Sequence, residues 1–124
     1  MKKLLFVLLL TISSVIHAEW QFVSQVDNEA KFYIDLTTIQ IINKNKRAWL
    51  KTEYIKKLGG EASSSRAYME FDCVEKKSRR LSFEAFSDSN LVGSIQFDKN
   101  LGDWIYSPPK SVSSSIMNLV CNKK

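Results

Sequence analysis

The stretch that decides the fold reads Arg66-Ala67-Tyr68-Met69-Glu70-Phe71-Asp72-Cys73. Apolar and polar side chains alternate along it, which is the period of a half-buried β-strand. One face of this strand carries Ala67, Met69, Phe71 and Cys73, and the other carries Arg66, Tyr68, Glu70 and Asp72. The alternation therefore predicts a sheet with an apolar face, and it turns Cys73 toward the core.

Further strand candidates, separated by turn residues, lie on both sides of this stretch. The sequence predicts them over residues 20–24, 31–35, 47–55, 79–86, 91–97 and 104–106. Turns are expected over residues 27–29, 35–39, 43–46, 75–78, 88–90 and 98–103, and the clearest loop over residues 58–65. Both faces of the 47–55 strand carry large side chains, so its inward face stays open.

The period changes after Pro108-Pro109. Val112, Ile116, Leu119 and Val120 have the spacing of an amphipathic helix, and Ser111 is a natural N-cap. A helix of about ten residues is unstable alone in water, so it must pack on the sheet. We predict an α+β fold with one antiparallel sheet of about six strands and a C-terminal helix on one face. The second face would stay partly uncovered, which points to a homodimer or a ligand surface.

Residues 1–18 have the pattern of a secretory signal peptide. Lys2 and Lys3 precede a compact apolar run, and the segment ends at the small residue Ala18. The run is shorter than the roughly 20 residues of a membrane-spanning helix, so no transmembrane segment is expected. We expect cleavage after Ala18 and a single exported domain over residues 19–124. Loss of the two lysines lowers the formal charge of +5 by two.

The chain has two cysteines, Cys73 and Cys121. They either pair or both stay free, and the oxidising environment outside the cytoplasm favours a disulfide. A structural zinc site needs four ligands, and the only histidine, His17, leaves with the predicted signal peptide. We therefore expect no metal site and no cofactor.

Catalytic arrangements are hard to find in the predicted domain. Without a histidine, serine–histidine and cysteine–histidine nucleophiles are excluded. Glu70 and Asp72 share one strand face about 7 Å apart, a spacing that could suit an inverting pair of carboxylates. The alternative, which we favour, is a solvated face with Arg66 as the cross-strand partner. The sequence therefore predicts a protein that is not an enzyme.

Basic residues gather in two groups near predicted turns. We take them as a candidate binding surface, which consists of Lys44, Lys46, Arg47, Lys51, Lys76, Lys77, Arg79 and Arg80. Such a surface could engage an acidic glycoprotein, a glycosaminoglycan or an anionic membrane. The alternative is that turns simply tolerate charge. The net charge is too mild for a nucleic-acid-binding protein, so no nucleic acid is expected as a partner.

The order of several landmarks resembles the surface-adhesin protein E family over nearly the whole predicted domain. These landmarks are Trp20, Phe32-Tyr33-Ile34-Asp35, Ile39, Trp49, Tyr54, Asp72-Cys73, Trp104, Pro109-Lys110-Ser111 and Val120-Cys121. The resemblance implies an antiparallel sheet with a C-terminal helix that a Cys73–Cys121 disulfide joins to it.

The resemblance also implies a function, namely adhesion to host cells or to extracellular-matrix proteins such as vitronectin and laminin. The family's adhesin is a lipoprotein, which needs a cysteine directly after the signal sequence, whereas Glu19 follows Ala18 here. We therefore expect no lipid anchor. The expected location is the periplasm, the medium or the cell surface of a Gram-negative bacterium. The alternative function is a periplasmic inhibitor or accessory protein of the cell envelope.

Overall fold

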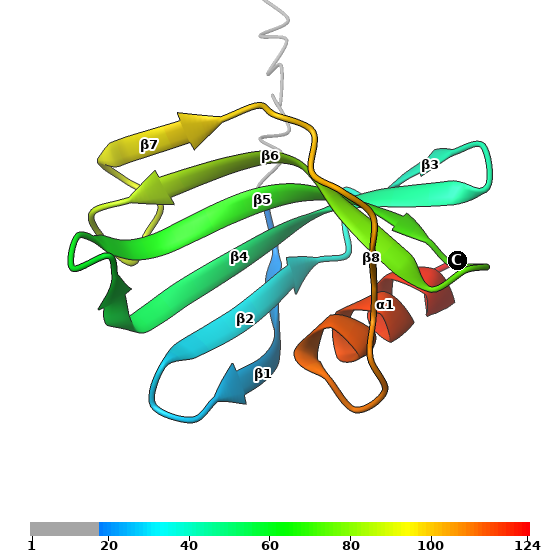
Figure 1. The fold of residues 1–124 in the computed structure, drawn as a ribbon, viewed down its shortest axis with the longest axis horizontal. Helices are drawn as coiled ribbons and strands as arrows, with labels where there is room; N and C mark the ends of the chain where they lie inside the picture. The colour runs from blue at the N-terminus through cyan, green and yellow to red at the C-terminus, as the bar shows by residue number, and fades with distance from the viewer. Residues whose placement is uncertain (1–17) are drawn as a thin grey trace, which may run out of the picture.

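The computed structural model describes residues 18–124, and all but the last residue of the predicted signal peptide lie outside this range. Residues 18–124 form eight strands and one helix, arranged as in Figure 1. The elements are β1 (Trp20–Val26), β2 (Ala30–Asp35), β3 (Gln40–Ile42), β4 (Asn45–Leu58), β5 (Ala62–Asp72), β6 (Lys77–Phe86), β7 (Ser94–Asp98), β8 (Ile105–Tyr106) and α1 (Val112–Asn122).

The strands make one antiparallel sheet in the order β1-β2-β4-β5-β6-β7. The two short strands extend it, since β3 pairs with the start of β4 and β8 with the start of β6. The α+β prediction is confirmed, with six strands on the main path and α1 on one face. No helix among residues 18–124 has the length and apolar character to cross a membrane.

The core lies between α1 and one end of the sheet. Ile34, Ala48 and Phe71 come from three neighbouring strands, and they pack against Ile116, Met117 and Val120 of α1. The inward face of β4 is therefore the one with Ala48 and Leu50, which the sequence left open. Successive side chains of a strand alternate between faces, so Arg47 and Trp49 lie on the opposite face. We call that opposite face the outer face.

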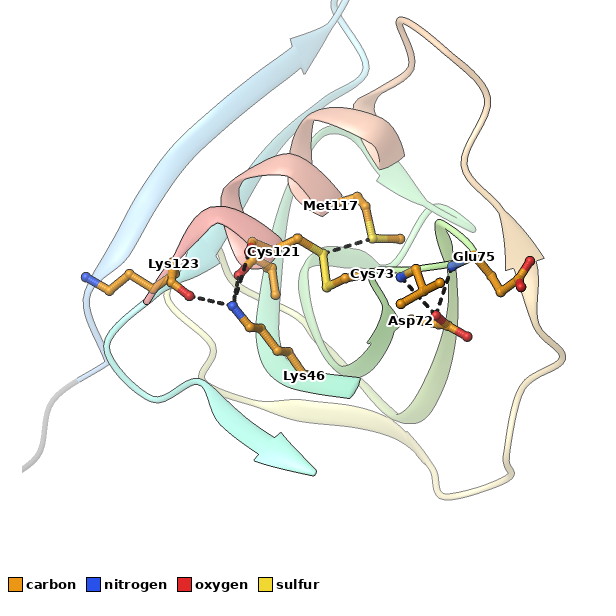
Figure 2. The surroundings of a disulfide bond; sticks show 9 residues. Lys46, Asp72, Cys73, Glu75, Met117, Cys121 and Lys123 are labelled. Carbon is orange, nitrogen blue, oxygen red and sulfur yellow. Dashed lines mark hydrogen bonds between the residues drawn. A yellow bond between two sulfur atoms is a disulfide. The ribbon is translucent and has the colours of Figure 1, made fainter. Parts of the chain in front are cut away.

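A disulfide and a lysine attach the end of α1 to the sheet (Figure 2). Cys73 and Cys121 are bonded, with their Cα atoms 5.8 Å apart, as predicted. Lys46 donates from Nζ to the carbonyl oxygens of Val120 and Cys121 at 3.2 Å, and also to that of Lys123. At the other end, Ser111 is the N-cap that the sequence predicts, and its side chain accepts from the Ser114 backbone N–H.

The predicted loop over residues 58–65 is wrong in its second half. The turn occupies only Gly59, Gly60 and Glu61, and the two glycines supply the positive φ values of 62° and 77°. Strand β5 begins at Ala62, and Ser64 and Ser65 are buried in it because their hydroxyls have partners. Ser64 donates to the Asp88 carbonyl, and Ser65 lies 2.8 Å from the Tyr54 hydroxyl.

Other boundaries shift by two or three residues. The turn expected over residues 75–78 lies over 73–76, and β7 begins at Ser94 rather than at Leu91. The turn expected over residues 35–39 is present. Asp35 closes it, because its carboxylate accepts hydrogen bonds from the Thr37 backbone, the Thr37 hydroxyl and the Thr38 hydroxyl.

Candidate binding face

The outer face of the sheet carries alternating aromatic and cationic side chains. Trp49 of β4 stacks on Tyr68 of β5, with ring centroids 4.7 Å apart. The Arg66 guanidinium lies over the rings of Trp49 and Phe86, at 5.5 Å from each centroid. Cation–π and stacking contacts of this kind hold side chains in place while leaving polar groups at the surface.

A buried carboxylate joins three strands of this face. Glu70 is only 3% exposed, and the register places Arg47 of β4 and Arg79 of β6 directly beside it. Its Oε1 accepts from Arg47 Nε at 2.8 Å, and its Oε2 accepts from Arg79 Nε and Nη2 at 3.0 and 2.7 Å. Burial raises the pKa of Glu70, but the hydrogen bonds from the two arginines outweigh it and hold that pKa below its ordinary value.

A cleft of about 440 Å³ opens beside these three side chains. Its other wall is the turn between β3 and β4, which contributes residues 42–45. Asn43 has a positive φ of 56°, so the turn is tight and brings Lys44 to the cleft. The cleft is therefore polar and has a basic rim.

The structure brings together four of the eight predicted basic residues near this end of the outer face. Arg47, Arg79 and Lys44 line the cleft. Lys77 follows on the same face of β6, where its Nζ lies over the rings of Trp104 and Tyr106, at 5.3 and 5.8 Å. Trp104 also covers the Arg79 guanidinium at 4.5 Å, a contact that the sequence did not predict.

The remaining basic residues have other surroundings. Lys46 donates hydrogen bonds to the carbonyl groups at the end of α1. Lys51 is 9% exposed and donates to Glu53 at 2.9 Å. Arg80 is in register with the core-facing Met69 and pairs with Asp98 at 3.6 Å, while Lys76 lies exposed in the turn before β6. The predicted set is thus divided: three members line the cleft and Lys77 lies near it, three others make contacts within the fold, and Lys76 is exposed in a turn.

The expected pairing of Glu70 with Arg66 is wrong. Arg66 is opposite Glu84 in the register and pairs with it at 2.8 Å, whereas Glu70 faces two other arginines and is buried rather than solvated. Asp72 accepts from the backbone N–H groups of Val74 and Glu75 at 3.1 and 3.0 Å. Both carboxylates that the sequence offered as a catalytic pair are therefore engaged in holding the fold.

A second, apolar hollow of about 230 Å³ lies on the helix side of the sheet. Phe32, Leu50 and Met69 line it from the strands, and Val112 and Ile116 line it from α1. It marks the place where the short helix stops covering the sheet. Among residues 18–124, no three metal-ligating side chains come together there or elsewhere.

Comparison with known proteins agrees with this architecture. The crystal form II structure of Haemophilus influenzae protein E matches with a TM-score of 0.68 and 14% identity, over 86% of this chain and 90% of that chain. A selenomethionine form of the same protein matches with a TM-score of 0.66 and 13% identity, over 86% and 88%. At these identities the likeness shows the fold.

The search of curated proteins returned no significant match. The family model described as surface-adhesin protein E matches residues 20–122, which is nearly all of the described chain. The match spans β1 to the end of α1 and includes both cysteines of the disulfide. The chain therefore belongs to the surface-adhesin protein E family.

Proposed function

We propose that this chain is an exported, non-enzymatic adhesin-like protein that binds host cells or extracellular-matrix proteins, with vitronectin and laminin as the first candidates. Family membership over residues 20–122 is the observation that carries the proposal. The engagement of Glu70 and Asp72 in ion pairs and a turn supports a binding role over a hydrolytic one. The basic cleft of the outer face offers a surface for an acidic partner.

Direct adsorption to immobilised vitronectin and laminin tests this function. We expect saturable binding by the folded protein, weakened by raised salt because exposed charges are screened. Changing both Lys44→Gln and Lys77→Gln should weaken it several-fold. The matched control, Lys56→Gln with Lys57→Gln, removes the same charge from the exposed end of β4 and should leave binding unchanged. If the protein binds neither vitronectin nor laminin, the assignment of these two partners is wrong.

Export is part of the proposal, with residues 1–18 as the signal peptide and residues 19–124 as the exported domain. Sequencing the mature N-terminus from fractionated cells should give Glu19 as the first residue. Material on the cell surface or in the medium supports adhesion. Confinement to the periplasm would instead favour the alternative, a periplasmic interaction or accessory protein.

We also propose that the protein forms a homodimer through the open edge of β7. The segment around this edge exposes a run of large apolar side chains, namely Val92, Ile95, Phe97, Leu101, Ile105 and Tyr106. A strand edge with unpaired backbone groups and apolar side chains is a template for pairing with another strand. A second copy offers the same edge, and two copies would then form one continuous antiparallel sheet.

A further inference from the structure

The ion pairs that Glu70 makes with Arg47 and Arg79 differ from the other ion pairs of the outer face. Lys51 is matched by Glu53 and Arg66 by Glu84, one cation to one carboxylate. Glu70 alone holds two arginines, so one positive charge is left over at this point. Lys44 adds a second at the rim of the same cleft.

Hydrogen bonds to Glu70 orient both guanidinium groups, but these bonds use only some of their N–H donors. Arg47 uses only Nε on Glu70, and Arg79 uses Nε and Nη2. Both terminal nitrogens of Arg47 and one of Arg79 therefore have no hydrogen-bond partner among the residues that the structure describes. The Trp104 ring, with its centroid 4.5 Å from the Arg79 guanidinium carbon, restrains that group. A site whose donors are already oriented loses little entropy when a ligand binds.

The unused donors and the surplus charge belong to one hollow. Arg47, Arg79 and Lys44 all line the 440 Å³ cleft, which is open to solvent and large enough for a side chain with part of its backbone. Guanidinium groups bind planar oxyanions with pairs of parallel hydrogen bonds, which makes a carboxylate a fitting ligand.

The charge pattern decides between a short acidic segment and a long polyanion. The surplus is highest at the cleft, where Lys44 and Lys77 adjoin the two arginines, because Glu53 and Glu84 pair with Lys51 and Arg66 farther along the same face. A sulfated polysaccharide that followed this face would have to pass those carboxylates. A partner segment that places one or two of its own carboxylates in the cleft would not have to pass Glu53 and Glu84.

We propose that the Arg47–Glu70–Arg79 cleft is the binding site for an acidic side chain of a partner protein, whose carboxylate is held by the free N–H groups of both arginines. Glu70 is a positioning residue that orients the two guanidiniums. This inference rests on the proposed function, because it names the chemistry by which the adhesin-like surface recognises its partner.

Arginine-to-lysine variants test the site while keeping its charge. The probe is a short oligoglutamate peptide, with a heparin fragment as a second arm, and binding is measured by titration calorimetry at low salt. We expect Arg47→Lys and Arg79→Lys each to weaken oligoglutamate binding about tenfold, since each removes oriented terminal N–H donors that Glu70 does not use. The matched control is Arg66→Lys, the same change on the same face outside the cleft, which should alter binding less than about twofold.

A further variant separates positioning from simple attraction. Glu70→Gln removes a negative charge, so bulk electrostatics predicts tighter binding of the acidic peptide. A positioning role predicts weaker binding, because the arginines lose the carboxylate that orients them. Unchanged circular dichroism at the working temperature checks that each variant is folded.

Several outcomes would overturn the inference. It fails if the two lysine variants bind oligoglutamate as tightly as the parent protein, or if Arg66→Lys weakens binding equally. It also fails if the heparin fragment binds through Arg47 and Arg79 while the peptide does not. If vitronectin and laminin still bind both lysine variants at full strength, the proposed function stands and this site falls. If the peptide binds as expected but neither matrix protein does, the site stands and those partners fall.

Discussion

At the scale of single residues, Glu70 shows what a sequence pattern can and cannot predict. The alternation of residues 66–73 placed Glu70 on the face opposite Phe71 correctly. Its partner depends on which residues of β4 and β6 lie beside it, and the turns between these strands set that register. Arg66 was a reasonable partner by proximity in sequence, but it faces Glu84 instead.

The same residue predicts a pH dependence. The pKa values of Glu53, Glu70 and Glu84 are all held below the ordinary value of 4.5 by hydrogen bonds from their partners, which for Glu53 and Glu70 outweigh burial. A carboxyl whose pKa is lower in the folded state stabilises the fold fully above its unfolded pKa. That stabilisation is lost as the pH falls through the folded pKa.

We therefore expect the melting temperature to be constant down to about pH 5 and to fall below it. Glu70→Gln should lower the free energy of unfolding at pH 7 by about 2 kcal/mol, because a charge-assisted hydrogen bond to each arginine is replaced by a weaker one. Its further loss on acidification should be smaller than that of the parent protein. Thermal unfolding followed by circular dichroism at several pH values measures both. Parallel curves for the two proteins would contradict the assignment.

At the scale of elements, some strands and the helix can be predicted from the sequence more clearly than others. Apolar and polar residues alternate without a break through residues 66–72 of β5. Helix α1 has a clear helical period and an N-cap, Ser111, so both elements were predicted. Strand β3 has three residues, too few for a period, and it was missed. Residues 63–65 looked like a loop because serine favours turns, but hydrogen bonds to Tyr54 and Asp88 allow two of these serines to be buried in β5.

Helix α1 is too short to be stable alone, so its attachment should control its stability. The Cys73–Cys121 bond closes a loop with a sequence separation of 48 residues, for which chain entropy predicts about 4 kcal/mol. Replacing both cysteines by serine should therefore lower the free energy of unfolding by roughly that amount. Urea unfolding of the variant and the parent gives the difference directly.

Lys46 provides a second, independent attachment of the same helix. Lys46→Met keeps an apolar stem of similar length but removes the hydrogen bonds to the carbonyls of Val120, Cys121 and Lys123. We expect a loss of about 1–2 kcal/mol and faster cleavage near the C-terminus by carboxypeptidase. Lys44→Met, in the turn just before β4 and exposed at the cleft, is the control. Equal effects from the two variants would show that the contacts of Lys46 with the helix do not stabilise it.

At the scale of the whole molecule, one short helix covers only part of a six-stranded path. The sequence predicted that the second face of the sheet would stay partly uncovered, and it pointed to the strand around Trp49 as the apolar surface. It did not point to the segment where most of the exposed apolar side chains gather. The structure places many of these side chains along β7 and the segment that follows, at the open edge of the sheet. That placement depends on strand order, which local patterns do not encode.

The exposed edge supports a final prediction about assembly. Phe97 is 55% exposed and lies on β7, whose outer edge has no strand partner among the described residues. In a dimer joined edge to edge, this side chain would pack against the second copy, and a charge in its place would need to be desolvated.

Phe97→Lys should therefore convert a concentration-dependent dimer into a monomer in sedimentation velocity. Its melting temperature under dilute, monomeric conditions should stay within about 2 °C of the parent, because exposed positions contribute little to folding. Ile41→Lys, at a more exposed apolar site on β3, is the control and should leave the dimer intact. A parent protein that sediments as a monomer at every concentration would exclude this mode of assembly, and the exposed apolar edge would then be free to pair with a strand of the partner protein.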